Sequence, residues 1–374
     1  MSKNINSNHS GIALVLSIVI AYAVTVLVST IAITCGWDTE STTYEWVMTA
    51  LTSLSILLSA LLVGRNKQDF SFGKLLNTKK VLNDPSLFKR ILYVIGICIT
   101  LLMFSSPVLS YLSAWLVELG FDTGIVSYPD VSGGYLVVGV VLLAIFPAVS
   151  EELLTRGVVL SGLKKGGYVF AILMSGFLFA IMHGNPLQLI HQFILGVIFS
   201  YLVVISGSIL PAIFGHFFNN FLSVIAISTM PSDMLNQPEP TLNELLNISN
   251  LIPNIVTAVV FLILLILLLR GYTNLMLDIK NTKLVTDKIH EGGDLDELKL
   301  VREIKSFKDI PRICEYLDET PVLKDSAEPK TNMLEDSTEP KNKNNRWSMW
   351  LFISIGVLGA LWILNTLMGF GIIK

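Results

Sequence analysis

The sequence predicts an all-α fold, a polytopic transmembrane helical bundle of about eight to nine spans. Of 374 residues, 52% are hydrophobic and 15% are charged, against roughly 45–50% and about 25% in an ordinary soluble domain. The mean hydropathy is +0.64. Runs of about 20 apolar residues, long enough to cross ~30 Å of hydrocarbon, recur along the chain. Because lipid offers no partner to backbone polar groups, helices are the expected spanning form.

Nine apolar stretches define the expected spans, and each satisfies its backbone hydrogen bonds within its own segment. They lie near residues 11–34, 46–64, 91–113, 135–160, 168–183, 187–205, 209–228, 251–270 and 348–370.

The charges between these spans predict how the chain is oriented. The stretch 65–90 carries seven bases, and 156–166 carries three, whereas 35–45, 116–133 and 229–250 carry acids and no base. Basic loops stay cytoplasmic. We therefore expect a multi-pass protein of the cell membrane whose N-terminus is cytoplasmic. The net charge of −3 gives no reason to expect a nucleic-acid partner.

The chain divides into five regions by composition. Residues 271–346 contain 13 Lys or Arg and 16 Asp or Glu, so we expect this region to be hydrated and cytoplasmic and to offer a surface to a cytoplasmic partner. Within it, apolar residues at helical spacing between Leu284 and Leu317 predict a short helical module. The other regions are N-terminal membrane helices (1–134), a core (135–228), an outer loop with the eighth span (229–270) and a C-terminal span (347–374).

The second part of the hydrophilic region contains a tandem repeat. Asp325-Ser-Ala-Glu-Pro-Lys330 is followed by Asp336-Ser-Thr-Glu-Pro-Lys341. High charge, proline and low apolar content predict a disordered tether.

The fourth span holds ionisable residues where most spans hold none. Such residues are expensive in lipid and are functional candidates by default. Glu152 and Arg156 stand at i, i+4, acid before base, and can pair on one helix face. Neighbouring residues of a helix point about 100° apart, so Glu151 faces elsewhere and stays available. Pro147, four residues before Glu151, can kink the helix toward a cavity.

Two later spans carry matching polar groups. His183 follows Phe179 by one helical turn in the fifth span, and His216 and Asn220 share one face of the seventh. A carboxylate, two imidazoles and a carboxamide form a set for acid–base catalysis with oxyanion stabilisation. Glu151 can deprotonate a water that His183 holds, while His216 and Asn220 stabilise the tetrahedral intermediate.

Each group has an ordinary structural interpretation when taken alone. An isolated Glu152–Arg156 pair near a span end is typical of snorkelling charges, and a lone intramembrane histidine is typical of a helix–helix hydrogen bond. We interpret His191 in the sixth span in this structural way. The combination on three different spans is what favours a functional site.

These residues resemble the three motifs of the CPBP family, also called the Abi family. The motifs are Glu151-Glu152-x-x-x-Arg156, Phe179-x-x-x-His183 and His216-x-x-x-Asn220, in this order. The family comprises CaaX-type prenyl endopeptidases and proteins of bacteriocin processing or immunity. The resemblance covers residues 135–228 and leaves out the segment 271–346 and the ninth span.

The resemblance implies an intramembrane, glutamate-dependent endopeptidase acting on a peptide or protein substrate within or at the membrane. Glu151 would activate water, with His183 as its partner. His216 and Asn220 would form the oxyanion site, and Glu152, Arg156 and Phe179 would support it. Two histidines and a glutamate can ligate zinc, but we expect no cofactor and a metal-free mechanism.

Two other function classes remain open. A non-catalytic immunity or scaffold protein would use the same polar residues only to hold helices together. A transporter would use them as a proton relay, although no inverted repeat of broken helices is visible. The depth of His183 bears on this choice. Glu151 lies ~20 Å from the cytoplasmic end of its span, whereas His183 lies near the far end of the fifth span.

Overall fold

The computed structural model describes residues 4–70, 72–77, 84–122, 131, 133–230, 240–292, 295, 298, 300–304, 307–318 and 347–373. These residues form helices and no strands, which confirms the predicted all-α class. In the described part of the chain, eight helices are long and apolar enough to cross a membrane: α1 (Ser7–Thr34), α2 (Thr42–Gly64), α5 (Leu87–Glu118), a composite helix over Gly133–Gly166, α10 (Leu189–Ser206), α11 (Leu210–Thr229), α14 (Ile248–His290) and α16 (Met349–Gly369).

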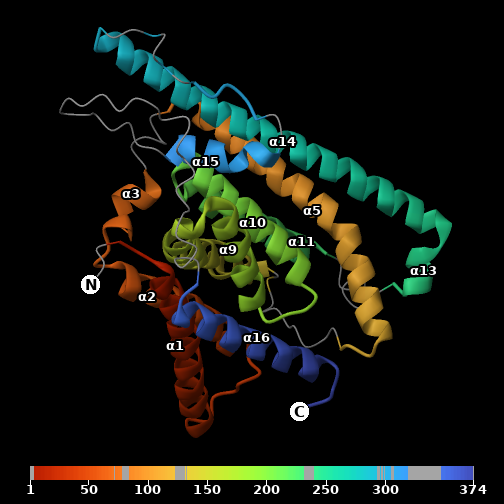
Figure 1. Ribbon diagram of the computed structural model, residues 1–374. Coiled ribbons are helices and arrows are strands. Elements are labelled where there is room, and N and C mark those ends of the chain that lie inside the picture. The colour runs from red at the N-terminus through yellow and green to blue at the C-terminus, as the bar shows by residue number, and fades with distance from the viewer. Residues whose placement is uncertain are drawn as a thin grey trace.

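The fifth predicted span forms a helix that is shorter than a full crossing. Helix α9 (Tyr168–Met182) has 15 residues, a length of about 22 Å against ~30 Å of hydrocarbon. The short helices α3 (Phe72–Leu76), α13 (Leu242–Leu246) and α15 (Ile310–Asp318) complete the described fold. Figure 1 shows α9, α10 and α11 at the centre, with α1 and α2 on one side and α5 and α14 on the other.

Two π-helical stretches interrupt the composite helix. A π-helix, η4 (Val140–Ile145), precedes α7 (Phe146–Glu152), and a second π-helix, η5 (Leu153–Leu160), follows it. Pro147 stands in the first turn of α7, where its missing N–H removes one bond of the ladder. All eight residues of η5 are buried, so this helix forms the centre of the core. The short segments α6 (Leu136–Gly139), α8 (Ser161–Leu163) and η6 (Lys164–Gly166) lie at its two ends.

Helices α9 and α10 form a central hairpin, and glycines with positive φ stand at both of its ends. Gly167 has φ +106° and separates the composite helix from α9, and Gly207 has φ +65° at the end of α10. Backbone with positive φ is strained for other residues but open to glycine. Pro211 then stands in the first turn of α11, as expected for a helix start.

Helix α14 corrects the expected organisation of the hydrophilic region. It runs for 43 residues without a break across the boundary expected at residue 270, a length of about 65 Å. The apolar residues predicted as a helical module are not helical between Val301 and Ile304. Instead, residues 301–304 are held by side-chain amides of α14. Asn281 Nδ2 donates to the Val301 carbonyl, and the Ile304 N–H donates to Asn274 Oδ1. The predicted disordered repeat lies outside the described residues.

Helix α16, the ninth predicted span, packs on the first helix and on the central hairpin. Gly11 of α1 lies so close to α16 that an added Cβ would meet the Trp350 carbonyl carbon at 2.2 Å. At the other end of α16, Asn365 Nδ2 donates to the Gly184 carbonyl oxygen at 3.2 Å. Figure 1 shows α16 crossing below the central helices. This helix is therefore integral to the bundle.

We predict that Gly11→Leu destabilises the protein, because the new side chain must push α16 away. Overpacking of this kind costs about 1–3 kcal/mol, and it should lower the melting temperature of the purified protein in detergent. Gly356→Leu on α16 is the matched control, since a Cβ there meets no atom within 4 Å. Equal melting temperatures for the two variants would contradict the close contact.

Candidate active site

Glu151, His183 and His216 come together between α7, α9 and α11. Glu151 Oε2 lies 3.9 Å from Nε2 of His183 and 3.9 Å from Nε2 of His216. The side chains are 14%, 19% and 4% exposed, respectively. Glu151 Oε2 is buried and accepts no hydrogen bond from the described part of the chain. A single carboxylate oxygen therefore faces two imidazole nitrogens across a gap too wide for direct hydrogen bonds.

The level at which His183 lies follows from helix lengths. Glu151 precedes the Lys164–Gly166 turn by about 20 Å of helix, and His183 follows Tyr168 by about 22 Å. Because the chain reverses at Gly167, both residues lie at the same height above the turn. The expected difficulty with the depth of His183 disappears because α9 is short.

Glu152 is the centre of a buried network. Its Oε1 accepts from Arg156 Nη1 at 2.8 Å, which confirms the pair predicted from the i, i+4 spacing. The same oxygen accepts from His216 Nδ1 at 2.9 Å, a contact that the spacing could not predict. The side chains of Glu152 and Arg156 are both 0% exposed. A buried charge pair must be closely matched to offset its desolvation, and here a second donor assists.

Arg156 is surrounded by partners from α7, η5, α9 and α10. Nη1 also donates to Thr155 Oγ1, and Nη2 donates to the Gly196 carbonyl of α10 at 3.0 Å. The guanidinium lies 4.6 Å from the Phe179 ring centroid and 5.7 Å from that of Phe199. These contacts are cation–π interactions, which strengthen when the cation is desolvated. Arg156 is thus held rigidly beside the cluster and lends Glu152 a fixed position.

Phe179 lies between the charged network and both imidazoles. Its ring, 0% exposed, makes edge contacts with His183 at 4.7 Å and with His216 at 5.8 Å between centroids. Its carbonyl oxygen lies 2.8 Å from His183 Nδ1. Since a carbonyl can only accept, His183 Nδ1 carries the proton. His216 Nδ1 likewise carries a proton, because its partner is the Glu152 carboxylate.

The tautomers have a direct consequence for the cluster. When either histidine is neutral, its Nε2 bears a lone pair and no proton. Glu151 Oε2 and the two Nε2 atoms are then three acceptors directed at one place. A water that donates its hydrogens to two of them can lie ~2.8 Å from each, in keeping with the 3.9 Å separations.

Asn220 forms its hydrogen bonds with groups outside the cluster of Glu151, His183 and His216. Its Nδ2 donates to the Leu143 carbonyl of η4 at 3.1 Å, and its Oδ1 accepts from Asn219 Nδ2 at 3.4 Å. Asn220 Nδ2 has a second proton that this bond does not use. The structure thus holds Asn220 against the π-helical turn that precedes Glu151.

Sequence reasoning did not single out several supporting groups. Thr155 donates to the Glu151 carbonyl at 2.6 Å while it accepts from Arg156. Gly196 lies so close to Gly176 that a Cβ added to Gly196 would lie 2.8 Å from the Gly176 Cα. Small residues on neighbouring spans could have indicated this close approach of α9 and α10, because small residues let transmembrane helices pack closely. His191 is bonded to Ser105 Oγ at 3.0 Å, in agreement with its structural interpretation.

The fold and the site together define a multi-pass membrane protein with a carboxylate–imidazole cluster enclosed by its central helices. Residues 133–222 match the family model described as type II CAAX prenyl endopeptidase Rce1-like. They therefore form an Rce1-like domain, which confirms the CPBP resemblance and includes every residue of the cluster. The match covers about a quarter of the chain. No curated protein and no solved structure matches this chain.

We predict different outcomes for the two adjacent glutamates. Glu152→Leu leaves Arg156 buried without its carboxylate, which should cost about 3–5 kcal/mol and lower the melting temperature markedly. Glu151→Gln should melt close to the wild type, because Oε2 of Glu151 accepts no hydrogen bond within the described structure. Melting in detergent, followed by tryptophan fluorescence, measures both.

The double variant Glu152→Leu/Arg156→Met is the matched control for this comparison. Removing both charges should restore part of the stability lost in Glu152→Leu, because no unpaired ion remains. A double variant as unstable as the sum of the single ones would show that the pair is not the coupled unit described.

Proposed function

We propose that this chain is an intramembrane endopeptidase that hydrolyses a peptide bond of a peptide or membrane-protein tail. The observation that carries the proposal is the convergence of Glu151 Oε2 and two imidazole Nε2 atoms at 3.9 Å inside an apolar bundle. The Rce1-like domain supports the same reaction class, since its family is one of prenyl endopeptidases.

In the proposed mechanism, Glu151 takes a proton from water while His183 Nε2 accepts the other hydrogen and orients the oxygen. The water attacks the scissile carbonyl and forms a tetrahedral intermediate. Glu151 then passes its proton to the leaving amine as the carbon–nitrogen bond breaks. The apolar walls keep bulk water out, which strengthens each of these interactions.

His216 and Asn220 would stabilise the oxyanion of this intermediate. For His216 to donate from Nε2, the ring must carry two protons, since Nδ1 already donates to Glu152. The Glu152 carboxylate, 2.9 Å from Nδ1, accepts that hydrogen bond and fixes the ring. Asn220 would contribute the second proton of Nδ2. Glu152 therefore has a positioning role: it fixes the orientation of the His216 ring.

The proposed mechanism is metal-free, and the spacing of the acceptors supports this choice. Ligand atoms about 2.0–2.1 Å from a tetrahedral zinc ion lie ~3.3–3.4 Å apart. The two separations of 3.9 Å exceed that spacing. Among the residues that the structure describes, no group of three His, Cys, Asp or Glu side chains has metal-binding spacing.

We predict that Glu151→Gln and His183→Ala each abolish peptide cleavage by the purified protein while the melting temperature stays near that of the wild type. Two quenched-fluorescence peptides of one sequence serve as probes, one with a farnesylated cysteine four residues from its C-terminus and one with serine there. His191→Gln is the control, a buried histidine outside the cluster. Cleavage that persists in both site variants would refute the assignment.

The two peptides also distinguish substrate classes. Cleavage of the farnesylated peptide alone would support a CaaX-type substrate, and cleavage of both would support a general peptide or protein tail. If the wild type cleaves neither while Glu151→Gln keeps the biological effect in cells, the chain is a non-catalytic immunity or scaffold protein.

We predict that Asn220→Ala lowers kcat by about 10²–10³ and leaves KM nearly unchanged, as expected when a donor acts mainly in the transition state. Steady-state kinetics with the better peptide measures this change. Ser223→Ala is the control, an exposed position on α11 whose hydroxyl donates to the backbone carbonyl of Asn219. A fall confined to KM would mean that Asn220 binds substrate and does not stabilise the oxyanion.

A further inference from the structure

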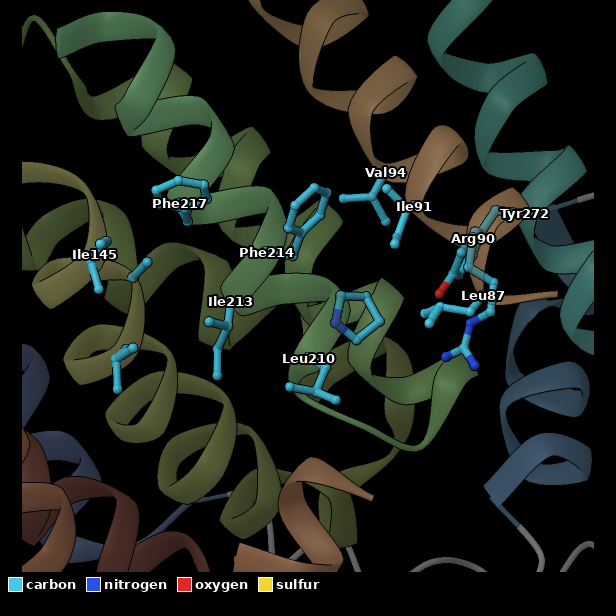
Figure 2. Close-up of a pocket in the computed structure, with 13 residues that line it drawn as sticks. Leu87, Arg90, Ile91, Val94, Ile145, Leu210, Ile213, Phe214, Phe217 and Tyr272 are labelled. Carbon is cyan, nitrogen blue, oxygen red and sulfur yellow. The ribbon is translucent and has the colours of Figure 1, made fainter. Parts of the chain in front are cut away.

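The helices that carry the active site are joined to one another unevenly. The Glu152–His216 hydrogen bond ties α7 to α11, and a cavity of about 450 Å³ lies between these two helices, α5 and α14. Figure 2 shows Phe214 and Phe217 of α11 beside this cavity. His183 stands at the end of α9 and takes no part in the Glu152–His216 bond. The end of α9 therefore needs a support of its own.

Asn365 of α16 gives the end of α9 such a support. Its Nδ2 donates to the carbonyl oxygen of Gly184 at 3.2 Å, one residue after His183. Two other polar side chains of the same helix, Ser354 and Thr366, donate instead to carbonyls of α16 itself. The amide of Asn365 thus joins two helices, whereas these hydroxyls bond within one.

The contact depends on a glycine at residue 184. Gly184 has φ +63° and follows α9 in the left-handed conformation that commonly ends a helix. A Cβ at this position would lie 2.6 Å from Asn365 Nδ2, so a side chain there would displace the amide. The backbone conformation and the space at Gly184 therefore both suit a hydrogen bond from α16.

The hydrogen bond lies at a depth where water is scarce. His183 follows Tyr168 by about 22 Å of helix, and Asn365 follows Met349 by about 24 Å. Both lengths are shorter than the ~30 Å of a hydrocarbon core. In hydrocarbon, a polar group that loses its protein partner finds no water to replace it. Polar side chains in such places commonly hold transmembrane helices together.

Helix α16 is itself fixed near both ends. Before its first turn, the rings of Trp347 and Phe170 pack edge to face with centroids 5.4 Å apart. At its last residue, the carbonyl of Gly369 accepts a hydrogen bond from the Asp122 N–H at 2.8 Å. A helix held at both ends keeps Asn365 in a defined place relative to α9.

We propose that Asn365 is a positioning residue for the peptidase reaction and acts through His183. By holding the Gly184 carbonyl, it fixes the last turn of α9 and with it the distance from His183 Nε2 to the Glu151 carboxylate. Displacement of a catalytic group by about 1 Å can lower a rate about 10²-fold. This inference rests on the proposed function, and it adds a residue outside the Rce1-like match of residues 133–222.

Kinetics of the full-length protein in detergent, with the two peptides described above, test the inference. Asn365→Leu keeps a side chain of similar size without the amide, and it should lower kcat about tenfold while KM stays within about twofold. Asn365→Gln retains an amide donor and should recover most of kcat. Thr366→Val is the matched control, because its hydroxyl bonds within α16, and it should cleave like the wild type.

Hydrogen exchange measured by mass spectrometry adds a readout besides activity. Asn365→Leu should speed the exchange of amides in residues 183–189, because only the junction with α16 opens. Exchange in residues 168–179 and the melting temperature should stay as in the wild type. Faster exchange along the whole of α9 would mean a general loss of structure and would overturn the positioning role.

The outcomes separate this inference from the proposed function. A wild type that cleaves neither peptide refutes the proposed function and the role of Asn365 together. If the wild type cleaves and Asn365→Leu is equally fast, the role of Asn365 alone is refuted. The same holds if Asn365→Gln is as slow as Asn365→Leu, because the amide is then not what matters. In both of these cases the assignment of Glu151 stands.

Discussion

The buried carboxylate of Glu152 is the contact on which the centre of this bundle depends. One of its oxygens accepts from both Arg156 and His216, and so joins the composite helix to α11. Arg156 in turn reaches the backbone of α10 and the ring of Phe179 on α9. In hydrocarbon, none of these groups has water as an alternative partner, so each must find its partner within the protein. The network therefore fixes four helices relative to one another.

The same network explains how two adjacent glutamates come to differ. A helix turns neighbouring side chains about 100° apart, so Glu152 faces the charged network and Glu151 faces the imidazoles. The π-helical turns on either side of α7 coincide with this point. Such irregular turns are frequent at functional sites because they re-aim side chains. A rigidly paired carboxylate thus lies next to one whose Oε2 accepts no hydrogen bond from the described residues.

The sequence predicted the features that depend on local geometry. It did not predict those that depend on contacts between residues far apart in the chain. Apolar length predicted the spans, and the i, i+4 spacing predicted the Glu152–Arg156 pair, because both depend on local geometry. The contact of His216 with Glu152 could not be predicted, since it joins residues on two helices. Helix α9 occupies nearly the predicted residues, but it is too short for a full crossing because Gly167 (φ +106°) precedes it and Gly184 (φ +63°) follows its end. Residues 301–304 were expected to be helical because their apolar spacing does not show that side-chain amides of α14 hydrogen-bond to their backbone.

The contacts of α16 bear on the order in which the membrane protein is assembled. This helix follows α1 by most of the chain, yet it meets the backbone of α1 at Gly11 and binds the Gly184 carbonyl next to His183. A chain leaving the ribosome inserts its helices one after another, so α1 must wait in the bilayer until α16 arrives. The cluster around Glu151 thus gains its last supporting contact only when synthesis has passed residue 369. The position of this cluster is in this way coupled to completion of the bundle.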